Sequence, residues 1–286
     1  MKCKKCGKNA ITYLKPYRIA LCKDCYVDFY KNLVRRSINR FKILKRGERI
    51  LASVSGGKDS SAMASILKEL GYDVELLYID LGIGEYSKVS EKAVRDLARD
   101  LDLDLNVVRL KDYGFTISDV EISKVCSACG ISKRYIMNRF ARENDFDVVA
   151  TGHTAEDVVV FYIKNIASGS KVWAEKLLPR VEGFDKFVTK VKPLYEMSEK
   201  ENLLYVICKE IPHTLEECPH APNPDWKEIV YEIERRKPGF VKNFVRGIVK
   251  EEKPMKIMHC KICGEVSSGE VCAFCKLRMK YCRSKA

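Results

Sequence analysis

The chain has 286 residues, of which 46% are hydrophobic and 32% are charged. This composition is typical of a soluble globular protein, and the length allows one α/β domain with small accessory modules. No apolar run approaches the roughly eighteen residues of a membrane span. Residues 1–6 are basic but are not followed by the apolar stretch of a secretory signal. We therefore expect no membrane partner and a cytoplasmic location.

Lys and Arg number 52 against 39 Asp and Glu, which gives a formal net charge of +13. If eight cysteines bind two zinc ions as thiolates, this net charge falls by four, to +9. A surplus of this size favours a polyanionic partner such as nucleic acid. The alternative is an ordinary charged and soluble surface, which the net charge alone does not exclude.

Thirteen cysteines are more than a cytosolic protein ordinarily carries, and in a reducing compartment they indicate metal binding or catalysis. Eight of them form two sets with zinc-site spacing, C-x₂-C-x₁₅-C-x₂-C and C-x₂-C-x₈-C-x₂-C. The members are Cys3, Cys6, Cys22 and Cys25, and Cys260, Cys263, Cys272 and Cys275. Four thiolates complete a tetrahedral structural zinc site, and the metal would supply the folding energy of such small modules. His259 and Cys282 lie beside the second set and are interpreted as bystanders.

The chain divides into five parts. Residues 1–26 form the N-terminal four-cysteine zinc module, and residues 27–47 form a basic amphipathic helix whose Arg35, Arg36 and Arg40 are expected to contact phosphates. A catalytic domain follows at 48–222. The remaining parts are a helical connector at 223–256 and the C-terminal four-cysteine zinc module at 257–286.

Strand and helix patterns alternate through the catalytic domain. The expected strands are 49–55, 74–80, 105–110 and 147–150, and the expected helices are 59–70, 87–102, 132–144 and 155–167. This alternation predicts an α/β fold with a parallel sheet covered on both faces. Ligands of such sheets bind at the carboxyl ends of the strands.

A phosphate-binding loop directly follows the first expected strand of this domain. Its sequence is Ser55-Gly56-Gly57-Lys58-Asp59-Ser60. The glycines let backbone N–H groups approach an anion, and the following helix N-terminus and lysine add positive charge. It is not a Walker A loop, because Asp59 stands where Ser or Thr follows the lysine. The segment resembles the PP-loop of the ATP pyrophosphatases, which cleave ATP between the α and β phosphates. The alternative is a plain glycine turn.

Four cysteines lie in the catalytic domain. Cys126 and Cys129 precede the helix expected near Ser132, where a helix N-terminus favours the thiolate. Cys218 precedes a proline, as at the end of iron–sulfur ligand runs. Cys208 lies in an apolar stretch and is interpreted as core filling. We take Cys126, Cys129 and Cys218 as the catalytic set, with ordinary unreactive thiols as the alternative.

The combination of PP-loop, Cys-x-x-Cys, later single cysteine and flanking zinc modules resembles the tRNA 2-thiouridine synthetase family. Its TtuA type, which thiolates the T-loop uridine, is the most similar. The matching segments cover nearly the whole chain in order: 82–87, 126–130, 133–135, 216–219 and 243–247.

The resemblance implies that Cys126, Cys129 and Cys218 hold a [4Fe–4S] cluster with one iron free to carry sulfur. It implies that Lys133 stabilises charge near the adenylylated base, and that Asp157 positions Mg²⁺ or takes a proton. The ATP-binding residues would be Ser53, Ser55, Gly56, Gly57, Lys58, Asp59, Ser60, Asp80, Gly152 and His153.

One segment departs from the family pattern. Where the family often has Gly-His-Asn-x-Asp-Asp, residues 152–157 have Thr154 and Glu156 in place of Asn and Asp. Nucleotide binding remains the expectation, but the metal geometry is in doubt. His153 also has a structural interpretation, as a residue satisfied at a strand end.

We therefore expect an ATP-dependent tRNA uridine 2-sulfurtransferase that releases AMP and pyrophosphate. The sulfur donor would be a ubiquitin-like thiocarboxylate carrier protein or inorganic sulfide, and the chain is a candidate homodimer. Three alternatives stay open. The cysteines could use a persulfide without a cluster, the target could be a wobble uridine or a cytidine, or the chain could be a zinc-ribbon RNA-binding protein with a relic nucleotide fold.

Overall fold

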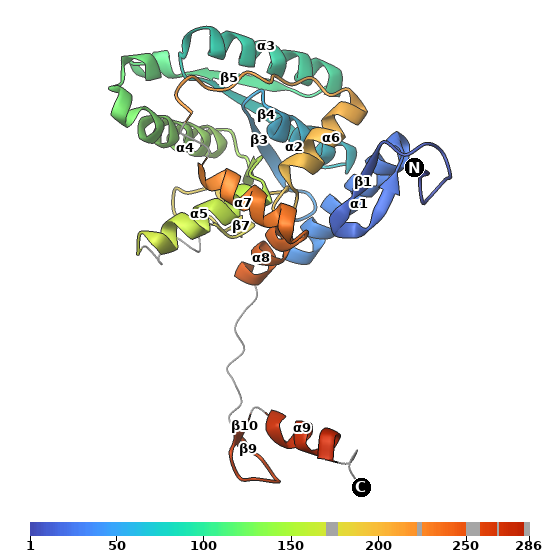
Figure 1. Cartoon of the computed structure of the whole chain (residues 1–286). Coiled ribbons are helices and arrows are strands. Elements are labelled where there is room, and N and C mark those ends of the chain that lie inside the picture. Colours follow the sequence, from blue (N-terminus) through green and yellow to red (C-terminus); the bar gives the residue numbers. More distant parts are fainter. Residues whose placement is uncertain (170–176, 222–224, 250–257, 268, 283–286) are drawn as a thin grey trace. The chain divides into compact units, whose positions relative to one another are not determined.

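The structure is a computed structural model that describes residues 1–169, 177–221, 225–249, 258–267 and 269–282. The chain forms two compact units, Met1–Ile248 and Val249–Ala286 (Figure 1). None of the helices in these described ranges combines the length and the apolar character that crossing a membrane requires.

Within the described residues, six strands form the central sheet. Their order is β5 (Leu105–Arg109), β4 (Asp73–Asp80), β3 (Arg49–Val54), β6 (Val148–Thr151), β8 (Thr189–Val191) and β7 (Arg180–Val181). Neighbouring strands are parallel except for β7, which runs antiparallel to β8. The expected α/β fold and its four strands are confirmed. The sequence did not predict β7 and β8, because runs of two and three residues are too short to show a period.

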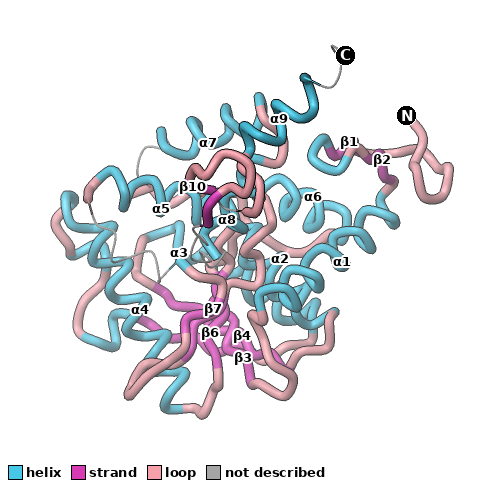
Figure 2. Tube along the Cα trace, turned by 90° about the horizontal axis from the view of Figure 1, so that it is seen from below, coloured by secondary structure: helices cyan, strands magenta, loops and turns pink. Residues whose placement is uncertain are grey.

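Helices cover both faces of this sheet. The right-handed crossovers α2 (Lys58–Glu69) and α3 (Gly84–Leu101) run toward β5, whereas α4 (Val125–Glu143) and α5 (Ala155–Ala167) lie on the opposite face. Figure 2 shows the strands between α2 and α4. On the α4 face, Leu51, Leu77 and Val149 of the strands pack with Ile136 and Met137 of the helix. Burial on both faces explains why the strands are continuous apolar runs.

The strand order reverses between β3 and β6. The chain leaves β3 toward α2 on one face and leaves β6 toward α5 on the other, so a crevice opens at the carboxyl ends of these two strands. Ser53 at the end of β3 is paired with Thr151 at the end of β6. The PP-loop and the segment from Gly152 therefore begin side by side.

The N-terminal module is joined to this core through α1 (Lys23–Phe41). The helix begins and ends earlier than the predicted 27–47, and Cys25 lies inside its first turn. Tyr30 of α1 is fully buried and stacks on Tyr205 of α6 (Glu199–Lys209), with ring centroids 4.3 Å apart. Its hydroxyl also donates to Asn202 Oδ1 at 2.7 Å. The basic helix is thus part of the core.

The predicted connector, 223–256, is helical over most of its described residues, 225–249, and packs against the catalytic domain; its other residues lie outside the described ranges. It contains α7 (Asp225–Arg236), which contacts α5, and α8 (Phe240–Val249). Arg246 of α8 and Arg40 of α1 both pair with Glu196 Oε1, a carboxylate that is 4% exposed. Arg40, which we expected to contact phosphate, therefore holds α1 against the buried carboxylate.

The remaining elements are short. The N-terminal module contains the hairpin β1 (Thr12–Leu14) and β2 (Ile19–Leu21), and the C-terminal module contains β9 (Met258–His259), β10 (Val266–Ser267) and α9 (Ala273–Cys282). Single 3₁₀ turns lie at Lys15–Tyr17, Leu110–Tyr113, Ile117–Asp119 and Ile122–Lys124.

The Arg40–Glu196 ion pair predicts that substitutions at two arginines of α1 change the free energy of unfolding by different amounts. Arg40→Glu places a carboxylate beside the buried Glu196 and should lower the free energy of unfolding by about 1–3 kcal/mol, since half of the arginine side chain is exposed and solvent screens part of the repulsion. The matched change Arg35→Glu, at an exposed position, should alter it by less than about 0.5 kcal/mol. Urea unfolding of the two variants measures the difference. Equal losses of unfolding free energy in the two variants would show that the Arg40–Glu196 ion pair does not stabilise the fold.

Candidate active site and metal centres

The PP-loop connects β3 to α2 in a conformation that requires glycine. Gly56 has φ +83°, and a Cβ at this position would lie 2.9 Å from the carbonyl oxygen of Ser90 in α3. The N–H of Ser55 donates to Ser60 Oγ at 3.1 Å, and this hydroxyl donates to the Gly57 carbonyl at 2.9 Å. No described side chain caps the α2 N-terminus, so its amide groups face the crevice as an anion site would require.

The segment after β6 approaches this loop closely. A Cβ at Gly152 would lie 3.0 Å from the backbone N of Ser60. His153 follows, and its Nδ1 lies 2.8 Å from Thr151 Oγ1. Burial lowers the pKa of His153, which favours the neutral ring. The structure therefore brings Gly152 and His153 to the PP-loop, while the hydrogen bond to Thr151 also satisfies the structural interpretation of His153.

Lys58 lies among carboxylates at the mouth of the crevice. Its Nζ is 2.9 Å from Asp59 Oδ2 and 3.2 Å from Glu199 Oε2, and Asn202 donates to Asp59 Oδ1 at 2.8 Å. Burial lowers the pKa of Lys58, but the charges of Asp59 and Glu199 outweigh it and raise the pKa above its ordinary value. The lysine is therefore fully charged.

Asp157 is held at the start of α5. It accepts hydrogen bonds from the Thr154 N–H at 3.0 Å and the Thr154 hydroxyl at 3.1 Å, which closes a capping box. Its other oxygen lies 2.9 Å from Lys227 Nζ. Burial raises the pKa of Asp157, but the Lys227 charge and the Thr154 N–H bring it below its ordinary value. Thr154, which departs from the family pattern, thus supports an ionised Asp157.

Glu156, the second departure, points into the protein. It is 4% exposed and accepts the N–H of Glu199 at 3.2 Å. Burial raises the pKa of Glu156 to about 8, so this side chain holds a proton at neutral pH. It supports the first turn of α6, whereas the Lys227 charge helps to lower the pKa of Asp157 and of Glu199 below their ordinary values.

Asp80, an expected ATP-binding residue, is used in the turn after β4. Its Oδ1 accepts the Gly82 N–H at 2.9 Å and its Oδ2 lies 3.3 Å from the Arg109 guanidinium. Gly82 has φ +72°, so the carboxylate stabilises a turn that needs glycine.

The three cysteines of the catalytic set come from two segments that meet. The helix α4 begins at Val125 and not near Ser132, so Cys126 and Cys129 lie in its first two turns. Cys126 Sγ donates to the carbonyl of His220 at 3.2 Å, just beyond Cys218. Cys129 and Cys218 pack against the same apolar cluster. Cys208 is 5% exposed in α6, as expected for core filling.

The Cys218 segment is tied to the PP-loop by backbone pairing. Thr214 N–H donates to the Gly56 carbonyl at 2.8 Å in a parallel bridge. The chain then continues through residues 215–217 to Cys218. Residues 214–220 therefore contact the PP-loop through Thr214 and Cys126 through His220.

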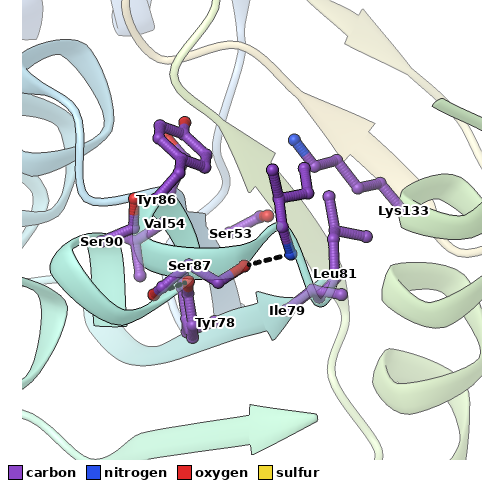
Figure 3. Close-up of a pocket in the computed structure, with 11 residues that line it drawn as sticks. Ser53, Val54, Tyr78, Ile79, Leu81, Tyr86, Ser87, Ser90 and Lys133 are labelled. Atoms are coloured by element: carbon purple, nitrogen blue, oxygen red, sulfur yellow. Dashed lines mark hydrogen bonds between the residues drawn. The ribbon is translucent and has the colours of Figure 1, made fainter. Parts of the chain in front are cut away.

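A pocket lies at the carboxyl ends of β3 and β4, beside the PP-loop (Figure 3). Ser53 and Ser55 line it from the end of β3, Tyr86 and Ser90 from α3, and Lys133 from α4. Figure 3 shows the Lys133 side chain extending from α4 toward this pocket. Burial raises the pKa of Tyr86, and the nearby Cys218 and Cys129 add to this increase. The pocket is thus lined by Ser53, by Lys133 and by Tyr86, and Cys218 and Cys129 lie near Tyr86.

The two four-cysteine sets near the ends of the chain have the geometry of single-metal sites. In each set all four ligand atoms lie within 4.8 Å of one another. In the first, the Sγ atoms of Cys6 and Cys22 are 3.5 Å apart; in the second, those of Cys263 and Cys272 are 3.7 Å apart. Backbone N–H groups, that of Cys272 foremost, lower the pKa of Cys260 to about 6, which favours the ligating thiolate.

Comparisons with known proteins agree with this arrangement. Residues 30–217 match the PP-loop domain family, and residues 2–27 match the N-terminal LIM domain of the 2-thiouridine synthetase TtuA. The tRNA-5-methyluridine(54) 2-sulfurtransferase of Pyrococcus horikoshii is 40% identical, over 96% of this chain and 93% of that protein. The tRNA-5-methyluridine(54) 2-sulfurtransferase of Thermotoga maritima is 38% identical, over 97% of this chain and 96% of that protein.

A solved structure agrees as well. The U34-tRNA thiolase NcsA from Methanococcus maripaludis, solved with its [4Fe-4S] cluster, superposes with a TM-score of 0.75 at 30% identity. The match covers 98% of this chain and 96% of NcsA. Sheet order and loop define a PP-loop α/β protein with a four-cysteine cluster near each end of the chain. The chain belongs to the tRNA 2-sulfurtransferase family that contains TtuA.

The close approach at Gly56 predicts different effects of alanine at the two loop glycines. Gly56→Ala should lower the free energy of unfolding by about 1–3 kcal/mol, because the new Cβ meets Ser90 and φ is positive. Gly57→Ala should change it by less than about 1 kcal/mol, because Gly57 has φ −79° and its nearest neighbour would be 3.7 Å away. Thermal unfolding compares the two. A larger loss at Gly57 would contradict the loop conformation.

Proposed function

We propose that the chain is an ATP-dependent tRNA uridine 2-sulfurtransferase that acts on the T-loop uridine. The observation that carries this proposal is the meeting of three segments: Ser55 of the PP-loop and Lys133 line one pocket, Thr214 pairs with Gly56 of the loop, and Cys126 contacts His220 just beyond Cys218. Membership of the tRNA 2-sulfurtransferase family supports the tRNA substrate. A relic nucleotide fold would not need to keep these chemical groups together.

In the proposed reaction, ATP binds with its phosphates at the PP-loop, and the uridine O2 attacks the α-phosphorus. The bond from the α-phosphorus to the bridging oxygen breaks, and pyrophosphate leaves. A sulfur atom then adds to C2 of the base, and AMP departs with the original oxygen. Lys133 lines the pocket where this charge develops, and its ammonium group would stabilise the negative oxygens.

The cysteine set fits an iron–sulfur cluster with an open position. Among the described residues, close grouping of ligand atoms within 4.8 Å occurs in the two four-cysteine sets, whereas Cys126, Cys129 and Cys218 are spaced more widely. Wider spacing suits a [4Fe–4S] cluster, whose cysteines each bind a different iron. Cys126, Cys129 and Cys218 would hold three of the four irons, and the cluster would supply an open position for the sulfur. NcsA, the similar thiolase, was solved with such a cluster.

The other proposed ions follow from charge and ligand number. The two four-cysteine sets would each hold a structural Zn²⁺, because four thiolates leave no open position for chemistry. The ionised Asp157, at the edge of the crevice, would bind Mg²⁺ that accompanies ATP. A cytoplasmic location, a homodimer and the identity of the sulfur donor, thiocarboxylate carrier protein or sulfide, stay predictions.

The choice of base rests on the relatives. Sequence identity is 38–40% to the tRNA-5-methyluridine(54) 2-sulfurtransferases and 30% to the U34-tRNA thiolase. We therefore favour the T-loop uridine over the wobble uridine. Either base must be unstacked from its loop to reach the pocket.

The ligand assignment predicts the metal content of two cysteine variants. Anaerobically purified protein should hold about four iron and about two zinc per chain. Cys218→Ala should lose the iron absorbance and keep the zinc, whereas Cys208→Ala, at a buried cysteine of α6, should keep both. Iron retained in the first variant and lost in the second would show that Cys208 is the third ligand. Wild-type protein that is active without iron would favour the persulfide mechanism.

The choice of base predicts which tRNA fragment is modified. With ATP and a sulfide source, the purified enzyme should thiolate a T-arm minihelix and leave an anticodon stem-loop unmodified. Mass spectrometry of the digested nucleosides measures both products. Thiolation of the anticodon fragment alone would contradict the T-loop assignment and leave the adenylylation chemistry unchanged.

A further inference from the structure

A lysine outside the PP-loop domain reaches the ATP crevice. Lys227 lies in the first turn of α7, in the part of the chain that the sequence indicated only as a connector. Its ammonium group contacts Asp157 Oδ1 at 2.9 Å and Glu199 Oε1. The side chain is 33% exposed, so it remains accessible to a ligand.

Lys227 and Lys58 hold opposite oxygens of the same carboxylate. Lys58 Nζ lies 3.2 Å from Glu199 Oε2, and Lys227 Nζ contacts Oε1. Glu199 is 15% exposed and thus largely removed from water. Two ammonium groups on either side of one carboxylate form an anion site, and here the protein's own carboxylate fills it.

A phosphate group would bind between the same two lysines. It presents oxygens on several sides and carries more charge than a carboxylate, and Lys58 already belongs to the phosphate-binding loop. The crevice holds three carboxylates, Asp59, Asp157 and Glu199, against these two lysines. Each lysine that turns from a carboxylate to a phosphate would supply an attraction that offsets the repulsion between the polyphosphate and these carboxylates.

We propose that Lys227 is a second phosphate-binding lysine, which with Lys58 binds the β- and γ-phosphates of ATP in the place that Glu199 occupies without ligand. The inference rests on the proposed function, because it assigns a ligand to the same ATP site. When the bond from the α-phosphorus breaks, the electron pair goes to the pyrophosphate, and both ammonium groups lie where this charge collects. The helix α7 is thereby part of the nucleotide site.

The test uses the full chain without its cluster and measures equilibrium binding of ATP, AMP and inorganic pyrophosphate. Lys227→Met should weaken ATP and pyrophosphate roughly 10- to 100-fold, the effect of losing one charged hydrogen bond, and leave AMP within about twofold. Lys227→Arg should restore most of the affinity for pyrophosphate. Lys237→Met, the same change at an exposed lysine just after α7, should have no effect.

Three results would overturn the inference. Equal weakening of ATP and AMP would show that Lys227 only attaches α7, and unchanged pyrophosphate binding would show that it does not contact the phosphates. If Lys227→Met does not fold, Glu199→Gln gives the answer: freeing both lysines should strengthen pyrophosphate binding without Mg²⁺, and weaker binding would contradict the proposal. Lys58→Met distinguishes failure of this inference from failure of the proposed function. Unchanged ATP binding in that variant would disprove the ATP site itself.

Discussion

The active site depends on close backbone packing around the PP-loop. Gly56 lies against Ser90 of α3, Gly152 lies against Ser60 of α2, and the Gly56 carbonyl accepts the N–H of Thr214. A side chain at either glycine would separate these segments by more than the pocket tolerates. The strand order of the sheet reverses here, so segments from both faces meet at the PP-loop. The functional side chains of these segments therefore lie around the same crevice.

The charged groups of the crevice are paired with one another. Lys58 and Lys227 alternate with Asp59, Glu199 and Asp157, so that none of these ionised groups is buried without an opposite charge. These ion pairs compete with ligand binding, because a ligand must exchange each ion pair for a new one. Part of the binding energy therefore separates the carboxylates from the lysines, and this favours ligands with several negative charges.

The sequence predicted those parts of the site that are local. The PP-loop, the spacings of the two four-cysteine sets and the four long strands are each contained in a short segment, where steric rules and ligand spacing are readable. It missed Lys227, because α7 reaches the crevice by packing on α5 and no local pattern records that contact. The ion pair of Arg40 with Glu196 was missed for the same reason, because the pattern of a basic helix does not record a partner far along the chain. The early start of α4 at Val125 was hidden by Gly130, a residue that disfavours helices.

The N-terminal module has a structural connection to Lys58 of the PP-loop. Tyr30 of α1 donates its hydroxyl hydrogen to Asn202 Oδ1, which fixes the orientation of the amide, and Asn202 Nδ2 then donates to Asp59. Asp59 in turn pairs with Lys58. Since Cys22 and Cys25 of the first four-cysteine set lie at the start of the same helix, folding of this module positions Tyr30. The module therefore supports the PP-loop through a chain of hydrogen bonds that begins in the core, in addition to any contact that its surface makes with RNA.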